Sequence, residues 1–373
     1  MCKNVIIKKI QYGDKKLLVH ICCSVDSHFF LQKLKEEFPR ERLIGFFYNP
    51  NIHPYSEYKL RLQDVKRSCK KLSIYLIEGE YDISHWFDRV NGFEEEREKG
   101  KRCDICFDVR LEISAKKAKE LGEKKLTTTL FMSPKKSHEQ LILASKKIEK
   151  EYNLNVFTPD FRKNGGTQAQ FALAKKDKLY HQNYCGCMFA LNRQREAQKK
   201  INDEMFMPIG REILPNSIEE KMKFYKKIIK YEKKEKEFEI EKRRFLNYRL
   251  LSAKTKYENK TIPSYILFHS IFKKEHIKIL LLTSDKDFAY KDEVVFLSLK
   301  EFNKLAKTRY KSVKSLIFSS ISIKKSLQIR AKIDNEKFSL TPIVVLDEII
   351  DGEYEIYSLT KSYEDIREVL VSI

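Results

Sequence analysis

The sequence lacks any stretch that is long and apolar enough to cross a membrane. No run of apolar residues approaches the roughly 20 that a spanning helix needs. The N-terminal stretch MCKNVIIKKI has no long apolar core before a small-residue cleavage site, so we expect no secretory signal. Internal repeats and long low-complexity linkers are also absent. These absences favour a cytoplasmic protein, in which clustered cysteines bind metal or do redox chemistry more often than they form structural disulfides.

Size and charge narrow the class of protein further. A chain of 373 residues can form one large domain or two ordinary ones, and a hydrophobic content of 42% excludes wholesale disorder. The formal net charge of +21 has two interpretations. It reflects either a lysine-rich composition throughout, or a polyanionic partner such as nucleic acid, which a positive field attracts by releasing counterions.

Short apolar runs alternate with helical patterns over the first half of the chain. This alternation predicts an α/β fold, a Rossmann-like parallel sheet with helices on both faces. Ligands bind at the carboxyl ends of the strands in such sheets, so we expect chemistry where the first strand opens into a loop, at Leu17–Ser27. The expected strands are Leu17–His20, Leu43–Tyr48, Ile74–Ile77 and Leu126–Leu130, and the expected helices are Phe29–Phe38, Ser56–Leu72, Ser84–Val90, Arg110–Leu121 and Ser137–Lys150.

Beyond about Phe189 the character of the sequence changes. Asn216–Leu246 is densely charged with a narrow apolar seam, which predicts an exposed helix. We therefore divide the chain into a catalytic domain (1–200), a charged helical connector (201–260) and a C-terminal α+β accessory domain (261–373), whose role the sequence does not indicate. Expected strands of this last domain are Tyr265–Phe268, Ile277–Leu282, Glu293–Leu297, Leu316–Ser320 and Ile343–Leu346.

Six of the eight cysteines fall in three tight pairs, and the pairs are the main clue to function. Cys2 and Cys69 stand alone and are interpreted as small buried hydrophobic residues. Cys103 and Cys106 form a C-x-x-C motif, where Lys101, Arg102 and a helix N-terminus would lower the thiol pKa values and favour metal-binding thiolates.

Together with Cys22 and Cys23, this motif offers four thiolates, enough for a tetrahedral zinc ion or an iron–sulfur cluster. Adjacent side chains in an extended chain point apart, which suits a wide cluster better than one ion. We therefore favour iron–sulfur over zinc.

The third pair, Cys185-Gly186-Cys187, is suited to alternate between dithiol and disulfide. Tyr180 and Tyr184 precede it, in a polar and aromatic run that could hold a substrate or simply pack on a helix.

Five sequence blocks, in order over residues 1 to about 195, resemble the epoxyqueuosine reductases of the non-cobalamin type. They are HICCSVDS (20–27), YNPNIHPYSEYKLR (48–61), GKRCDICFDVRL (100–111), TTTLFMSPKK (127–136) and YHQNYCGCMFAL (180–191). The resemblance implies an oxidoreductase of tRNA processing, which reduces epoxyqueuosine to queuosine at the wobble position in the final step of queuosine biosynthesis. It also implies two partners, a tRNA anticodon loop and an electron donor.

Carried over to this chain, the resemblance implies a [4Fe-4S] cluster on Cys22, Cys23, Cys103 and Cys106, and a redox-active disulfide at Cys185 and Cys187. Asp26 stands where many members carry a third cysteine. A second partition therefore fits the same residues, with three cysteines on the cluster and an additional single iron held by Asp26 and the remaining cysteine. Asp26 is equally well interpreted as a helix N-cap.

The resemblance also implies a fold of the HUP type, which includes the PP-loop ATPases. Cys22, Cys23 and Ser24 stand where a PP-loop has serine and two glycines, and their side chains would obstruct a phosphate cradle. Two alternatives remain, a PP-loop-like iron–sulfur tRNA thiolation enzyme and a zinc-stabilised RNA-binding module. Candidate proton donors are His20, Asp26, His53, Tyr180 and Tyr184, and candidate RNA contacts are Tyr48, Tyr55, Arg61, Arg162, Lys163 and the region beyond Pro215.

Overall fold

The computed structural model describes residues 16–206, 212–334 and 339–372. The chain divides into two compact units, Met1–Met205 with Tyr225–Lys234, and Phe206–Phe224 with Glu235–Ile373. Helix α8 (Ile218–Lys233) contributes to both. No helix in the described part of the chain is long and apolar enough to cross a bilayer.

The first unit is built on a five-stranded sheet in the order β3-β2-β1-β4-β5, in which every neighbouring pair is parallel. The strands are β1 (Lys16–Ile21), β2 (Arg42–Phe47), β3 (Tyr75–Glu78), β4 (Lys125–Thr128) and β5 (Asn155–Val156). Leu17, Leu18 and Val19 of the central strand are wholly buried, as a strand covered on both faces requires. The expected Rossmann-like sheet is confirmed.

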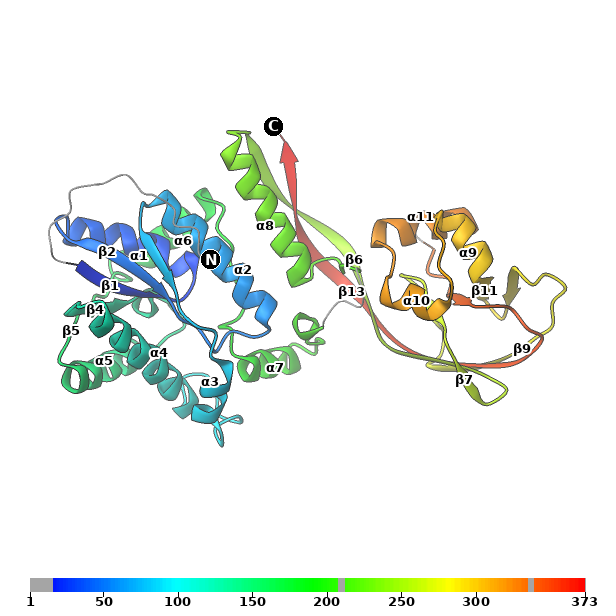
Figure 1. The fold of residues 1–373 in the computed structure, drawn as a ribbon, viewed down its shortest axis with the longest axis horizontal. Helices are drawn as coiled ribbons and strands as arrows, with labels where there is room; N and C mark the ends of the chain where they lie inside the picture. The colour runs from blue at the N-terminus through cyan, green and yellow to red at the C-terminus, as the bar shows by residue number, and fades with distance from the viewer. Residues whose placement is uncertain (1–15, 207–211, 335–338, 373) are drawn as a thin grey trace. The chain divides into compact units, whose positions relative to one another are not determined.

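Helices cover both faces of this sheet (Figure 1). One layer contains α1 (Ser24–Glu37), α2 (Tyr55–Lys71) and α6 (Gly166–Lys176), and the other contains α3 (Ile83–Val90), α4 (Lys101–Glu120) and α5 (His138–Tyr152). The chain leaves β1 for one layer and reaches β4 from the other. The carboxyl ends of β1 and β4 therefore form the topological switch point, where open α/β sheets bind their ligands.

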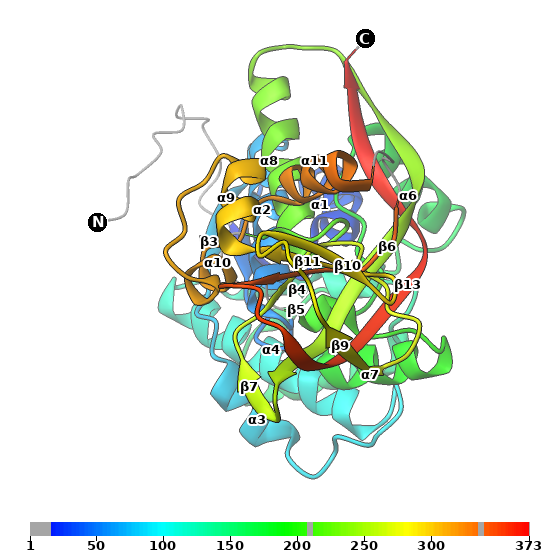
Figure 2. The same cartoon turned by 90° about the vertical axis from the view of Figure 1, so that its right-hand side faces the viewer.

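The second unit is the expected C-terminal α+β extension (Figure 2). One sheet has the order β10-β11-β12-β8, and the other has the order β7-β6-β13-β9. Strand β11 alternates between two cores: Val295 and Leu297 pack toward the helices, whereas Val294 and Phe296 pack toward the second sheet. The bounds of its elements are β6 (Phe238–Tyr257), β7 (Lys260–Ile262), β8 (Tyr265–Ile266), β9 (His276–Leu281), β10 (Phe288–Lys291), β11 (Val294–Ser298), β12 (Ile343–Leu346), β13 (Gly352–Ser372), α9 (Leu299–Ala306), α10 (Val313–Phe318) and α11 (Ile323–Asp334).

Three expectations about secondary structure are wrong. Helix α1 begins at Ser24 directly after β1 and the two cysteines, without the loop that we expected. The charged helix predicted over Asn216–Leu246 ends at Lys233, and Phe238–Tyr257 is instead a strand paired antiparallel with β13. The strand predicted at Leu316–Ser320 is wrong because the chain there forms the end of α10, which ends at Phe318. Long-range pairing overrides local helical periodicity in the charged segment.

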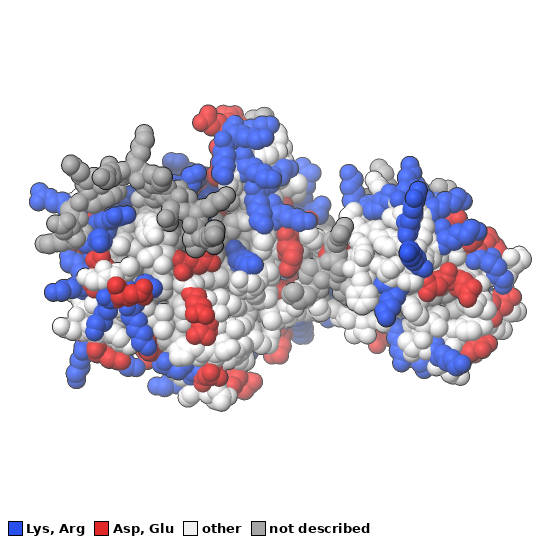
Figure 3. All heavy atoms as spheres, viewed as in Figure 1, with Lys and Arg blue, Asp and Glu red and all other residues white. Residues whose placement is uncertain are grey.

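Basic side chains are spread over both units on the face shown in Figure 3, with acidic side chains between them and several over α8. No single positive patch dominates that face.

The buried central strand yields a stability prediction. Leu18→Ala should lower the free energy of unfolding of the first unit by about 2–5 kcal/mol, because it leaves a cavity at a wholly buried position. Denaturant unfolding followed by the fluorescence of Trp86, the sole tryptophan, reports on this unit. Leu143→Ala is the matched control, since Leu143 is 61% exposed on α5, and equal destabilisation by both variants would contradict the assignment of the core.

Candidate functional site

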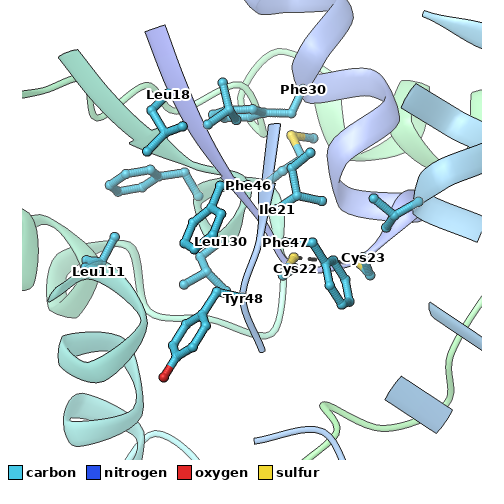
Figure 4. Packing of buried hydrophobic residues seen from close by; sticks show 14 of the residues in the cluster. Leu18, Ile21, Cys22, Cys23, Phe30, Phe46, Phe47, Tyr48, Leu111 and Leu130 are labelled. Atoms are coloured by element: carbon cyan, nitrogen blue, oxygen red, sulfur yellow. Dashed lines mark hydrogen bonds between the residues drawn. The ribbon is translucent and has the colours of Figure 1, made fainter. Parts of the chain in front are cut away.

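Cys22 and Cys23 lie at the switch point, between the end of β1 and the start of α1. Their sulfurs are 3.8 Å apart, and Figure 4 shows them facing each other beyond the end of the strand. Our expectation that these side chains point apart is therefore wrong. Cys23 is the N-cap of α1 and has an extended backbone, so the chain changes direction between strand and helix and brings the two side chains together.

Asp26 completes a compact group of metal-binding side chains. Its Oδ2 lies 3.4 Å from the Cys22 sulfur, and the ligand atoms of Cys22, Cys23 and Asp26 all lie within 4.8 Å of one another. In the described ranges, this is the one group of three or more such residues at that spacing. Asp26 stands in the first turn of α1 and Cys23 is the cap, so the N-cap interpretation of Asp26 is wrong.

Three polar side chains from other segments hold this group in place. The Thr129 hydroxyl, just beyond β4, accepts a hydrogen bond from the Cys22 N–H (3.0 Å) and donates to the Cys22 sulfur (3.2 Å). Gln170 on α6 donates to Asp26 Oδ1 (2.7 Å), and Gln182 donates to the Cys23 sulfur (3.0 Å). Such outer contacts orient metal ligands in proteins.

The group is buried, and burial disfavours the charged forms of Cys23 and Asp26. The hydrogen bond with Cys22 and burial raise the pKa of the Cys23 thiol well above its ordinary value. Burial also raises the pKa of Asp26. A bound cation would offset the cost of charging these two groups, and metal binding would thereby favour release of their protons. This donor set, two sulfurs and one carboxylate, fits iron.

The segment Cys185-Gly186-Cys187 lies against α2. Gly186 has φ +111°, and a Cβ there would come within 2.9 Å of Ile52 and 3.2 Å of the Arg61 guanidinium, so only glycine fits. Arg61 donates to the carbonyl oxygens of Cys185 (3.1 Å) and Tyr184 (3.0 Å). Its own Nε donates to Glu57 (2.7 Å), with which it forms a buried ion pair.

The two cysteines of this segment differ in acidity. Burial raises the pKa of Cys185, but the ammonium group of Lys136 and the N–H of Cys187 outweigh it, so that this pKa lies below its ordinary value. Burial and the neighbouring Cys185 raise the pKa of Cys187 to about 12. Cys185 is therefore the thiol that ionises first.

Cys103 and Cys106 lie in the first turns of α4, which begins at Lys101. The Cys103 sulfur accepts a hydrogen bond from the Lys99 N–H (3.2 Å). Burial raises the pKa of Cys103, so the expected lowering by the helix N-terminus is wrong for this thiol. The Arg102 guanidinium donates to the carbonyl oxygens of Phe93 and Glu94 instead.

One cavity brings together part of the expected site. Its walls include Cys22, Cys23, Asp26 and Cys185. Cys103, Cys106 and Cys187 are not among its lining residues, although all six paired cysteines belong to or pack against the same buried cluster. Lys136 also lines the cavity, and the thiols of Cys185, Cys103 and Cys106 raise the pKa of its ammonium group although burial opposes this charge.

The structure separates the candidate proton donors. His20 is wholly buried, bonds to Thr128 (2.8 Å) and to the Tyr48 carbonyl oxygen (3.0 Å), and has a pKa lowered by burial to about 3. The hydroxyl groups of Tyr180 and Tyr184 are engaged within the protein. Tyr180 donates a hydrogen bond to Glu57, and Tyr184 donates one to the His53 carbonyl oxygen. His53 bonds to the Asn51 carbonyl oxygen (2.8 Å) and is not among the lining residues of the cavity. Asp26 therefore remains as the candidate that lines the cavity and whose pKa burial raises.

Sequence reasoning missed the polar residues that surround the cysteines. Thr129 and Lys136 lie in the block TTTLFMSPKK, which we quoted without assigning roles, and Gln182 lies in the run before Cys185. A hydroxyl or ammonium side chain in a loop has no periodic signal. Its proximity to sulfur arises only when the ends of β1 and β4 are placed side by side.

Comparison with known proteins agrees with this geometry. The family model described as "Epoxyqueuosine reductase QueH" matches residues 17–193. A protein of that name from Helicobacter pylori is 41% identical over 347 residues, which cover 89% of this chain and 94% of that protein. This chain belongs to the QueH family of epoxyqueuosine reductases. The expected resemblance is thereby confirmed.

Other family members are shorter. The epoxyqueuosine reductase QueH of Thermotoga maritima is 35% identical over 190 residues, 50% of this chain but 95% of its own length. It therefore has little length left for a second unit. A solved structure of the U34-tRNA thiolase NcsA from Methanococcus maripaludis with its [4Fe-4S] cluster overlaps 59% of this chain and 73% of its own, with 14% identity and a TM-score of 0.32, values from which no shared activity follows.

The buried ion pair on α2 can be tested directly. Glu57→Ala should lower the free energy of unfolding by about 3–5 kcal/mol, because it leaves the buried Arg61 guanidinium without its carboxylate. Glu78→Ala removes a carboxylate from the exposed pair with Lys66 and should change stability by less than about 1 kcal/mol. Denaturant unfolding followed by Trp86 fluorescence measures both, and similar losses would contradict the role of burial.

Lys136 should control the reactivity of Cys185. In the reduced, metal-free protein, Lys136→Met removes the positive charge that favours the thiolate, so the pKa of Cys185 rises and less thiolate is present at neutral pH. Alkylation of Cys185 by iodoacetamide, followed by mass spectrometry across pH, should slow several-fold near pH 7.5, while Cys187 stays unreactive in both proteins. Lys135→Met alters the neighbouring lysine of the same cavity and should leave the alkylation rate unchanged. If Lys136→Met also leaves the pH dependence of Cys185 alkylation unchanged, Lys136 does not set the pKa of Cys185.

Proposed function

We propose that this chain reduces epoxyqueuosine to queuosine in tRNA, at the wobble position of the anticodon loop. The observation that carries the proposal is the cavity at the carboxyl ends of β1 and β4, where Cys22, Cys23, Asp26 and Cys185 meet. Family membership supplies the substrate, and the cavity supplies the thiols and the carboxylic acid that the reaction needs.

The reaction removes the epoxide oxygen as water and leaves an alkene, which consumes two electrons and two protons. Closure of Cys185 and Cys187 to a disulfide releases two electrons and two protons, so the dithiol balances the reaction. Cys185 lines the cavity and ionises first, whereas Cys187 is buried and is not among the lining residues. An electron donor then returns the disulfide to the dithiol for the next turnover.

The residues present fit an iron–sulfur cofactor. Cys22, Cys23, Cys103 and Cys106 would hold a [4Fe-4S] cluster, which when bound supplies single-electron transfer and a Lewis-acidic iron for the departing oxygen. The second partition, with Asp26 on an additional iron, has support in the 3.8 Å between the Cys22 and Cys23 sulfurs. Two sulfurs bound tetrahedrally to one ion at about 2.3 Å are about 3.8 Å apart.

In the first partition, where Asp26 binds no iron, Asp26 is the proposed source of a proton for the oxygen. Its carboxyl group lines the cavity beside the sulfurs, and burial raises its pKa, so that it holds a proton more readily than an exposed aspartate does. Gln170 fixes the other carboxyl oxygen and thereby aims the acid into the cavity.

The candidate RNA contacts divide by exposure. Tyr48 and Arg61 are buried, and Arg61 is bonded within the protein, so they are poor contacts for RNA. Tyr55 is 49% exposed, and the side chain of Lys163 is 75% exposed. Arg162 donates to the carbonyl oxygens of Ser133 (3.3 Å) and Lys136 (3.1 Å), so it shapes the cavity wall instead of facing solvent. Tyr55 and Lys163 are the contacts that we retain.

Anaerobic assay of epoxyqueuosine-containing tRNA, with iron and sulfide measured on the same sample, tests the proposal. Cys185→Ala should abolish turnover with a chemical reductant, because the dithiol can no longer form a disulfide, while leaving iron content unchanged. Cys69→Ala removes a buried lone thiol on α2 and should leave turnover intact.

Unchanged turnover by Cys185→Ala would refute the thiol relay. A requirement for ATP would instead identify a thiolation enzyme of the PP-loop kind. A colourless protein that contains zinc and binds RNA without turnover would identify the RNA-binding module.

A further inference from the structure

An aromatic pair lies on the wall of the cavity and leaves part of its surface exposed. Phe171 on α6 and His181 in the segment after it stack with ring centroids 5.4 Å apart and an interplanar angle of 29°. Both line the cavity, and both are exposed, Phe171 by 37%. A flat ligand that stacked on the exposed part of this pair would bury further apolar surface, so the position of the pair at the cavity wall suits such a ligand.

The pair is placed directly beside the reactive group. Gln170, the residue before Phe171, donates to Asp26. Gln182, the residue after His181, donates to the Cys23 sulfur. Each aromatic residue is thus adjacent in the chain to a glutamine that donates a hydrogen bond to the sulfur and carboxylate group. A flat ligand lying on the rings would be a close neighbour of whatever occupies that group.

The charge of the cavity wall favours a polyanion. Arg110, Lys135 and Lys136 line it together with Arg61, whose charge Glu57 neutralises. Asp26 is the one acidic residue among the lining residues. Lys135 is exposed and is free to approach a phosphate. Exposed aromatic rings combined with cationic side chains are the arrangement by which proteins bind unpaired nucleotides, with bases stacked on rings and phosphates paired with lysines.

We propose that Phe171 and His181 form a stacking platform for the base of a nucleotide that flanks the reacting nucleotide in the anticodon loop. The proposal rests on the proposed function and assigns positioning residues for it. Stacking the flanking base holds the loop open and presents the modified base to Cys22, Cys23 and Asp26. Because every base has a π-face, this platform selects for an unpaired loop and not for a particular flanking base.

The test compares steady-state kinetics on an anticodon stem-loop RNA that carries epoxyqueuosine, under anaerobic conditions with a chemical reductant. Phe171→Ala should raise KM roughly tenfold, as loss of one base–aromatic stack does, with kcat unchanged because the reacting group is intact. Phe171→Tyr keeps the ring and should retain the wild-type KM. Iron content and Trp86 fluorescence verify that each variant is folded and loaded.

Tyr75→Ala is the matched control. Tyr75 is an exposed aromatic residue (49%) of the same unit, but it begins β3 and so lies at the end of the sheet opposite the cavity. It should leave KM unchanged. An RNA that lacks one flanking base provides the partner variant: its removal and Phe171→Ala should each weaken binding, and together should weaken binding no more than one alone.

The outcomes separate this proposal from the proposed function. Turnover by the wild-type protein with a KM that does not respond to Phe171→Ala overturns the platform and leaves the proposed function standing. Binding that depends on Phe171, without turnover by the wild-type protein, supports the platform and overturns the proposed function. Additive effects of Phe171→Ala and base removal show that the ring and the base do not touch, and overturn the platform.

Discussion

The site depends on two buried carboxylates of α2 that tie separate segments of the chain together. Glu57 neutralises Arg61, and Arg61 in turn binds the carbonyl oxygens of Tyr184 and Cys185. About two helical turns further along α2, Asp64 accepts hydrogen bonds from the Ser24 hydroxyl (2.5 Å) and the Tyr180 N–H (2.7 Å). The two carboxylates thereby hold the segments of two cysteine pairs against one rigid helix.

Burial of these groups has an electrostatic consequence for the cavity. Glu57, Arg61 and Asp64 of α2 have hydrogen-bond partners within the protein. Cys23 and Asp26, in contrast, are buried with raised pKa values. A site built from such donors is poised to bind a cation, because the cation supplies the charge that stabilises their ionised forms. Lys136 does the same for Cys185 from within the protein. The cavity thus lowers the pKa of Cys185 and raises that of Cys23, so Cys185 ionises more readily than Cys23.

The second unit is an addition to a complete first unit. The residues assigned to the cavity all lie between Cys22 and Cys185, and the T. maritima relative is matched over 95% of its length by about half of this chain. The H. pylori relative is matched over nearly the whole of both chains. The family therefore includes proteins with and without this extension, and the cavity lies within residues 17–193, which the family model matches.

The sequence by itself determined much of the first unit. The apolar runs near Leu17, Leu43, Ile74 and Leu126 correctly predicted four strands, since a strand buried on both faces needs continuous apolar residues whatever its partners are. The spacing of the cysteines and the five sequence blocks correctly predicted the family. These features are local, and a single sequence displays them directly.

Only the tertiary structure decided how those features meet. It brought the Cys22 and Cys23 sulfurs to 3.8 Å, placed Asp26 beside them instead of at the cap, and set Thr129, Lys136 and Gln182 around the thiols. It also made the charged segment after Lys233 a strand, because this segment pairs with β13. The residues of β13 with which it pairs lie more than 100 positions later in the chain, so the pairing is invisible to local periodicity. Contacts between distant segments depend on register and on crossover geometry, and neither leaves a periodic trace in the residues that make the contact.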